Sequence, residues 1–270
     1  MSSGWPIGAG KCGSLIASKC GQWGKGGAWD LFVADNANLK IYKILPSGAV
    51  SSLATIASAP NGLGMDSLKN LYTLSNNGYV YKITPAGVVT TFSTSPGYPG
   101  GVVVDSSDNI YPIVTDMGVI YKITSGGSLS GFASGLSSPY GGIFDTGGNL
   151  YVAEYGGLII KITSGGTKTT FVSGMVSGSF GITMDSSGNF YVINNANGKV
   201  YKVTPGGVVT TFASLGGFSS PQGICIDSSG NLYVTLGGGQ VKQITPGGSV
   251  TTFVSTTLNS PWGIVYNGQA

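Results

Sequence analysis

The sequence lacks two of the side chains on which protein chemistry most often depends. Its 270 residues include no histidine and no arginine, and only one of the ten acidic residues is a glutamate, Glu154. Without histidine, the chain lacks the side chain best suited to proton transfer near neutral pH. Without arginine, it lacks bidentate recognition of phosphate and carboxylate groups. Both absences favour a binding or assembly protein over an enzyme.

Charge and cysteine are also scarce. Charged residues make up 9% of the chain, against about 25% in a typical soluble domain. The 13 lysines are spread along the chain, so we expect no nucleic-acid surface. No apolar run reaches the roughly 18 residues that a membrane span needs. The N-terminus has no basic start followed by an apolar core, so no secretory signal peptide is predicted. Three cysteines do not make a disulfide framework, and they do not fix the compartment.

Glycine, in contrast, is abundant, and much of it belongs to an internal repeat. A unit close to PxGIxxDSSGNLYVxxxxxGxVYKITPGGxVTTFxS recurs at a spacing of about 40 residues, which is typical of propeller blades. Each unit divides into four short strands separated by turn signals, and four strands make one blade. The aspartate of the unit recurs at Asp66, Asp105, Asp145, Asp185 and Asp227.

A sixth copy is split between the two ends of the chain. Residues 31–55 supply its second, third and fourth strands, and residues 260–266 supply its first. The sequence therefore predicts an all-β, six-bladed propeller over residues 30–270, whose first blade is closed by the C-terminal strand. Pairing the two ends satisfies strand edges that would otherwise be open.

The motif PxGIxxDSSGNLYV, followed by VYKITPGG, resembles the NHL repeat family and the streptogramin-lyase-like and gluconolactonase-like propellers, over residues 30–266. Streptogramin-lyase-like proteins use a histidine beside a Mg²⁺ site, and this chain has none. Gluconolactonase-like enzymes hold a divalent metal near the axis, for which the only equivalents are Glu154, Asn194, Asp116 and Asp35. Glu154 and Asp35 fall on opposite blades, so we predict no catalytic residue, metal or cofactor. A metal-dependent lactonase or lyase is the alternative.

Two repeated features, the DSSGN turn and a lysine on the third strand, can each be interpreted as structural or as functional. The DSSGN turns contain oxygen donors of the kind that bind calcium, but their spacing is not that of an EF-hand, and their aspartates can instead accept backbone N–H bonds within the turn. A lysine also recurs on the third strand, where its aliphatic stem can cover apolar surface. We expect a structural role for both. The lysine series is Lys43, Lys82, Lys122, Lys161 and Lys202.

Two other positions differ between the repeats, at the end of the propeller where ligands usually bind. The residue before the first-strand glycine is Asn61, Gly100, Tyr140, Phe180, Gln222 or Trp262. The third residue after the second-strand aromatic is Asp35, Ser75, Val114, Glu154, Asn194 or Leu236. Such divergence is expected of a single asymmetric site and equally of unconstrained loops. We call this end of the propeller the mouth. As a binding site, it offers aromatic rings for stacking in Tyr140, Phe180 and Trp262. Hydrogen-bonding groups come from Asp35, Asn61, Glu154, Asn194 and Gln222.

Residues 1–29 lie outside the repeat and form a predicted N-terminal arm. The arm contains Trp5, Trp23 and Trp29, together with Cys12 and Cys20, which form a small disulfide loop or are free. Tryptophan is enriched at the centres of interfaces. The arm is expected either to cap the propeller or, as we slightly prefer, to dock into a neighbouring subunit.

These features lead to three hypotheses. The first is a non-enzymatic interaction module, such as a structural protein of a virion or of a cell surface, that contacts other protein subunits through its arm. The second is the metal-dependent lactonase or lyase. The third is a carbohydrate-binding propeller that uses the aromatic side chains of the mouth.

Overall fold

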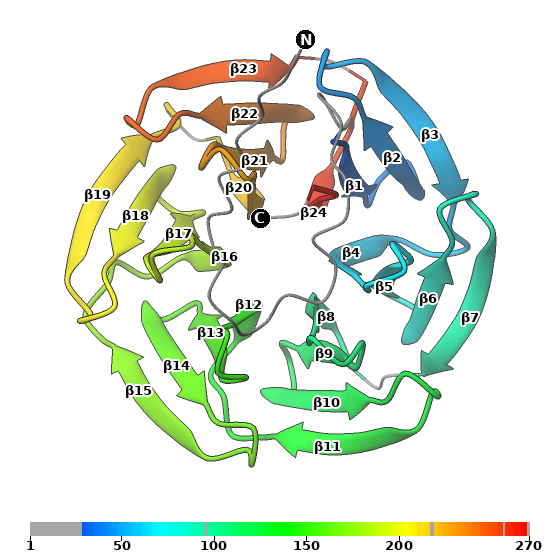
Figure 1. The fold of residues 1–270 in the computed structure, drawn as a ribbon, viewed down its shortest axis with the longest axis horizontal. Coiled ribbons are helices and arrows are strands. Elements are labelled where there is room, and N and C mark those ends of the chain that lie inside the picture. Colours follow the sequence, from blue (N-terminus) through cyan, green and yellow to red (C-terminus); the bar gives the residue numbers. More distant parts are fainter. Residues whose placement is uncertain (1–28, 95–96, 217–218, 256, 269–270) are drawn as a thin grey trace, which may run out of the picture.

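The computed structural model describes residues 29–268 except 95–96, 217–218 and 256. These residues form 24 β-strands and no helix, in six four-stranded antiparallel sheets around a central axis (Figure 1). The predicted six-bladed all-β propeller is therefore confirmed. Within these ranges, no helix is long and apolar enough to cross a membrane.

Each blade runs from an inner strand beside the axis to an outer strand at the rim (Figure 1). From inner to outer, the strands are β24 (Pro261–Tyr266), β1 (Leu31–Asp35), β2 (Lys40–Ile44) and β3 (Val50–Thr55) in blade 1; β4 (Pro60–Met65), β5 (Leu71–Ser75), β6 (Tyr79–Ile83) and β7 (Val89–Thr94) in blade 2; β8 (Pro99–Val104), β9 (Ile110–Val114), β10 (Val119–Ile123) and β11 (Leu129–Ala133) in blade 3; β12 (Pro139–Phe144), β13 (Leu150–Glu154), β14 (Leu158–Ile162) and β15 (Lys168–Val172) in blade 4; β16 (Ser179–Met184), β17 (Phe190–Asn194), β18 (Lys199–Val203) and β19 (Val209–Ser214) in blade 5; and β20 (Pro221–Ile226), β21 (Leu232–Leu236), β22 (Gln240–Ile244) and β23 (Val250–Val254) in blade 6.

The split blade is closed as the sequence predicts. Strand β24 pairs antiparallel with β1, with Leu31 opposite Tyr266 and Val33 opposite Ile264. Both Leu31 and Val33 are fully buried, because side chains from blade 6 and from β24 cover them. The two ends of the propeller are thus joined by a strand ladder and by the core beneath it.

The turn between the first and second strands explains the repeated aspartate. In blade 2, one carboxylate oxygen of Asp66 accepts the backbone N–H of Asn70 at 2.7 Å. The other oxygen accepts the Asn70 side-chain amide at 2.8 Å and the Tyr72 hydroxyl at 3.1 Å. The same contacts to the asparagine recur around Asp105, Asp145, Asp185 and Asp227. These carboxylates are therefore occupied in fixing the turn, and no group of three potential metal ligands occurs among the described residues.

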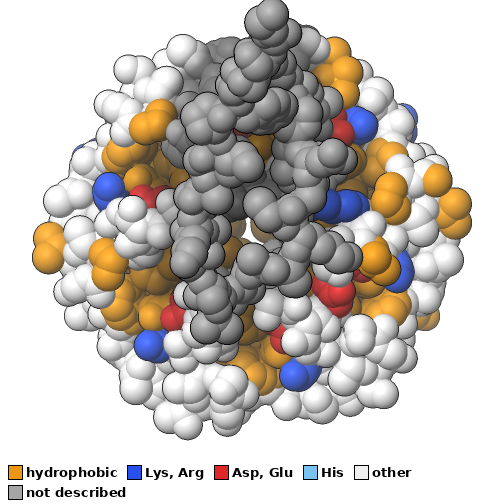
Figure 2. All heavy atoms as spheres, in the orientation of Figure 1, with side chains coloured by type: hydrophobic (Ala, Val, Ile, Leu, Met, Phe, Trp, Pro, Cys, Tyr) orange, Lys and Arg blue, Asp and Glu red, His pale blue; other side chains and the backbone are white. Residues whose placement is uncertain are grey.

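The repeated lysine packs beside the tyrosine of this turn. In blades 2 to 5, the lysine ammonium lies 5.6–5.7 Å from the centre of the tyrosine ring, which is cation–π distance. Blade 1 has phenylalanine in place of the tyrosine, and there Lys43 pairs with Asp30 at 2.9 Å. Figure 2 shows lysine and acidic side chains next to one another at intervals around the ring. The lysine series is therefore part of the repeated scaffold.

The hydrophobic core lies in the seams between blades. One cluster joins Phe32 and Ile41 of blade 1 to Leu63, Leu71 and Ile83 of blade 2. Equivalent clusters fill the other seams with side chains from the two adjoining sheets. Because each sheet buries both faces against its neighbours, the ring holds the inner strands at fixed places around the axis.

Candidate functional site

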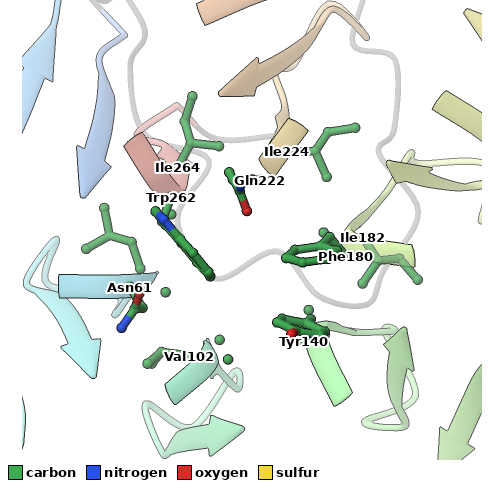
Figure 3. Close-up of a pocket in the computed structure, with 18 residues that line it drawn as sticks. Asn61, Val102, Tyr140, Phe180, Ile182, Gln222, Ile224, Trp262 and Ile264 are labelled. Carbon is green, nitrogen blue, oxygen red and sulfur yellow. The ribbon is translucent and has the colours of Figure 1, made fainter. Parts of the chain in front are cut away.

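The candidate site is the axial cavity at the end of the propeller where the inner strands begin. Each inner strand brings its variable residue to this cavity, which has a volume of ≈ 90 Å³ (Figure 3). A pocket for a drug-sized ligand usually measures about 300–1,000 Å³, so this cavity admits one small group while the rest of a ligand stays outside. The variable residues that line it are Asn61, Gly100, Tyr140, Phe180, Gln222 and Trp262.

The glycine that follows each variable residue allows the six inner strands to approach one another. A Cβ atom on Gly223 would lie 2.2 Å from the carbonyl oxygen of Trp262, and one on Gly101 would lie 2.5 Å from the carbonyl oxygen of Tyr140. Thr235 also bridges two inner strands, since its hydroxyl donates to the Trp262 carbonyl at 2.9 Å. The repeated glycine thus sets the width of the axial cavity.

Four aromatic side chains lie close together at the mouth. Tyr140 and Phe180 stack with their ring centres 4.0 Å apart at 21°. Tyr155 lies 6.2 Å from Tyr140 and 6.0 Å from Phe180, while Trp262 lies 6.3 Å from Phe180. Burial raises the pKa of Tyr140, and the neighbouring Tyr98 and Tyr155 raise it further, so the Tyr140 phenol is neutral at physiological pH. We call Tyr140, Tyr155, Phe180 and Trp262 the aromatic cluster.

Sequence reasoning missed Tyr98 and Tyr155, which extend this surface. Both are partly exposed, with 48% of Tyr98 and 43% of Tyr155 accessible. They lie in loops outside the two repeated positions that the sequence comparison singled out. Tyr98 lies just before β8 and Tyr155 in the turn between β13 and β14, so a search for aromatic residues in both kinds of loop would have found them.

Two amide side chains line the cavity with different hydrogen bonding. The Asn61 amide is fully engaged, since its oxygen accepts from Asn36 at 3.0 Å and its nitrogen donates to Asn76 at 2.7 Å. The Oε1 atom of Gln222 is buried and has no hydrogen-bond partner among the described residues. Because Gln222 lines the cavity, a turn of its side chain would present this acceptor to a ligand, whereas Asn61 shapes the wall.

Three other predicted mouth residues are not among those that line this cavity. Asp35, Glu154 and Asn194 end their strands and turn toward the loop that precedes the inner strand of their own blade. Glu154 accepts the Ser137 N–H at 2.7 Å, and the Asn194 amide donates to the Val176 carbonyl at 2.7 Å. All three are buried, with Asp35 and Asn194 at 0% exposure.

Glu154 lies beside a second cavity, of ≈ 240 Å³, which Ser137 and Lys168 also line. Figure 1 places β1, which carries Asp35, and β13, which carries Glu154, on opposite sides of the ring. The structure therefore does not bring these two carboxylates together at the mouth.

The predicted assembly arm is described only at its last residue. Trp29 packs in the seam between blades 6 and 1, with its ring centre 5.6 Å from that of Tyr233 and 5.7 Å from that of Tyr266. This tryptophan thus belongs to the packing of the propeller. Trp5, Cys12, Cys20 and Trp23 lie outside the described residues.

The sequence matches no protein-family model. It also matches no curated protein. Among solved structures, the fold is similar to a chain of a nidogen/laminin complex, with a TM-score of 0.79 and 18% identity over 88% of this chain and 98% of that one. The fold is also similar to that of a streptogramin B lyase, with a TM-score of 0.68 and 16% identity over 87% of this chain and 91% of that one. A third similar structure is a catalytically inactive histidine-to-alanine variant of virginiamycin B lyase from Staphylococcus aureus, with quinupristin. It gives a TM-score of 0.63 and 19% identity over 87% of this chain and 78% of that one.

At these identities, the likeness concerns the fold, and the resemblance stated from the repeat motif is confirmed at that level. The neighbours include a chain of a protein–protein complex and an enzyme. The same architecture serves binding and catalysis, so function has to be argued from the residues of this chain.

Proposed function

We propose that this protein is a non-catalytic recognition module, which binds its partner at the end of the propeller where the inner strands begin. The observation that carries the proposal is the aromatic cluster, which combines Tyr140 and Tyr155 of blade 4, Phe180 of blade 5 and Trp262 of blade 1. Aromatic side chains are enriched at the centres of binding surfaces, because they offer a large contact area with few rotatable bonds.

The chemistry of the mouth supports recognition over catalysis. The chain has no histidine, while the related-fold virginiamycin B lyase is described as inactive when a histidine is replaced by alanine. The carboxylates of Asp35 and Glu154 accept hydrogen bonds from backbone N–H groups of the neighbouring loops, and they fix the positions of those loops. A carboxyl group that acts as a general acid or base has to lie within reach of the substrate, and the residues that line the cavity include no carboxylate.

The proposal includes a place in a larger assembly, on a virion or a cell surface, reached through the N-terminal arm. Low charge and the tryptophan content of residues 1–28, with Trp5 and Trp23, support this part. Deletion of residues 1–28 is expected to convert an oligomer into a monomer with an unchanged β-sheet spectrum, measured by light scattering and circular dichroism. An unchanged molar mass after the deletion would contradict the docking role.

Binding at the mouth is tested by selecting ligands without assuming their class. The full chain is screened against a random peptide phage library and a glycan array, and the ligands obtained are titrated against Trp262→Ala and Leu68→Ala. Leu68 is 73% exposed and lies in the turn between β4 and β5, at the far end of β4 from the mouth. Truncation of a central aromatic residue typically weakens binding at least about tenfold, so we expect that loss with Trp262→Ala and none with Leu68→Ala. Ligands that bind both variants equally would place the binding surface elsewhere.

A further inference from the structure

The axial cavity is asymmetric because one blade contributes no side chain at the variable position. Blade 3 has Gly100 where the other blades have a side chain, and a Cβ there would lie 2.4 Å from the Thr115 hydroxyl oxygen and 2.9 Å from the Pro139 carbonyl oxygen. The close approach of Thr115 in the same blade and of Pro139 in blade 4 therefore excludes any side chain at this position. In Figure 3, the opening lies between Trp262 on one side and Tyr140 on the other.

The residues around this opening carry no charge. The cavity is lined by glycine, aliphatic and aromatic residues together with the amides of Asn61 and Gln222. Burying a charged group without a partner is costly, so the surface selects against charged ligands. The group that enters is therefore neutral and small.

The buried acceptor of Gln222 defines the polarity of that group. A buried polar atom without a partner is unfavourable, and once the Gln222 side chain turns toward the cavity, a hydroxyl or amide N–H from a ligand would satisfy its Oε1 atom. The aromatic cluster offers ring surface beside it, with Trp262 on one side and the Tyr140–Phe180 stack on the other (Figure 3). A ligand that fits both features has an apolar face and a donor on its edge.

A peptide main chain fits this place less well. Extended peptides bind along a free strand edge, where their backbone groups continue the sheet. The outer edge strands lie at the rim, away from the axis (Figure 1). The inner strands are too close together to admit another strand, since a Cβ on Gly62 would lie 2.5 Å from the backbone nitrogen of Val102.

We propose that the mouth takes one neutral sugar ring of a glycan, whose C–H face packs on the aromatic cluster and one of whose hydroxyls donates to the Gln222 Oε1 atom. The exposed phenol of Tyr98, beside the cluster, contacts the neighbouring sugar outside the cavity. This inference rests on the proposed function, of which it names the ligand class.

The test compares neutral, sialylated and sulfated glycans on an array with the labelled full chain, followed by calorimetry with the neutral oligosaccharide that binds best. We expect binding to neutral glycans. Gln222→Leu should weaken it about 3- to 10-fold, the value of one neutral hydrogen bond. Trp262→Ala should weaken it at least about tenfold, whereas Trp262→Phe should retain most of the affinity, and Leu68→Ala all of it. Melting temperatures establish that each variant is folded.

The outcomes separate this inference from the function on which it rests. If peptides bind in a Trp262-dependent way and no neutral glycan binds, the sugar assignment is wrong and the recognition surface stands. A preference for sialylated or sulfated glycans would overturn the argument from charge. Glycan binding that survives both Gln222→Leu and Trp262→Ala would show that the sugar lies elsewhere on the protein.

Discussion

Asp35 is the side chain that ties the two ends of the propeller together, although it was predicted as a mouth residue. It is fully buried, and its carboxylate accepts the backbone N–H groups of Asn259 at 2.7 Å and Ser260 at 3.1 Å. It also accepts the backbone N–H of Asn38 at 3.1 Å and the Asn38 side-chain amide at 3.0 Å. One carboxylate thus connects the end of β1 to the segment that leads into β24. We therefore expect Asp35→Ala to destabilise the closure of the ring.

The expected loss of stability follows from the two hydrogen bonds that Asp35 accepts from the segment before β24. Hydrogen bonds to a charged group contribute about 1.5–3 kcal/mol each, so losing both predicts a decrease of about 3–6 kcal/mol in the free energy of unfolding. For a domain of this size, about 2–4 °C in Tm corresponds to 1 kcal/mol, which gives a decrease of at least about 6 °C. Thermal unfolding followed by circular dichroism measures it.

Two variants control this prediction. Asp35→Asn keeps the shape and one acceptor oxygen, so it should lose less stability than Asp35→Ala. Leu68→Ala removes an exposed side chain, and surface substitutions usually change stability by no more than about 0.5 kcal/mol. If Asp35→Ala melts within about 2 °C of the wild-type protein, a range set by that surface effect, the reasoning that assigns closure to this carboxylate is refuted.

Two further predictions concern the repeated scaffold. Gly223→Ala places a Cβ atom 2.2 Å from the Trp262 carbonyl oxygen, and should lower the free energy of unfolding by about 1–3 kcal/mol. As a control, Gly238→Ala, with no atom within 4 Å of its Cβ, should leave the urea midpoint of unfolding nearly unchanged. If Gly223→Ala and Gly238→Ala unfold at the same urea concentration, the close-approach argument is wrong. Burial raises the pKa of the Asp185 carboxyl, but hydrogen bonds from Asn189 bring the pKa below its ordinary value. A carboxyl with a lowered folded-state pKa stabilises the protein above its unfolded-state pKa, near 3.9, and this stabilisation is lost as the pH falls through the folded-state value. Urea titrations from pH 7 to pH 2 should therefore show stability falling below about pH 4, with a smaller fall for Asp185→Asn; equal falls would exclude this role for Asp185.

The repeat predicted the architecture because the same physical constraints act in every blade. A tight turn needs an acceptor such as Asp66 for its N–H groups, and the spacing of such turns defines the blades. The split copy at the chain ends predicted the pairing of β1 with β24, and the structure has that pairing. The predicted first strand of blade 1, residues 260–266, differs by one residue from β24 (Pro261–Tyr266).

The site was less predictable, because it depends on where loops fold. Asp35, Glu154 and Asn194 end their strands as expected, but each side chain bonds a loop that the sequence does not place. Variation between repeats identified the positions of Tyr140 and Trp262 at the axis. This variation did not predict that Tyr140 would stack on Phe180 of the next blade. Contacts between side chains of different blades depend on how closely the inner strands approach one another, which the sequence does not state.

The joining of distant chain segments in blade 1 has a consequence for how the molecule is made. Residues 224 positions apart in the sequence meet at Asp35, and contacts of such separation form late and slowly during folding. Until β24 has emerged from the ribosome, β1 presents an open edge and an uncovered apolar strand, which is the kind of surface that invites association with other chains. The other five blades each consist of four consecutive strands, so the partner strands of each sheet are made one after another. The ring can therefore close only after β24, the last strand of the propeller, has been made, and β1 is most exposed just before β24 docks.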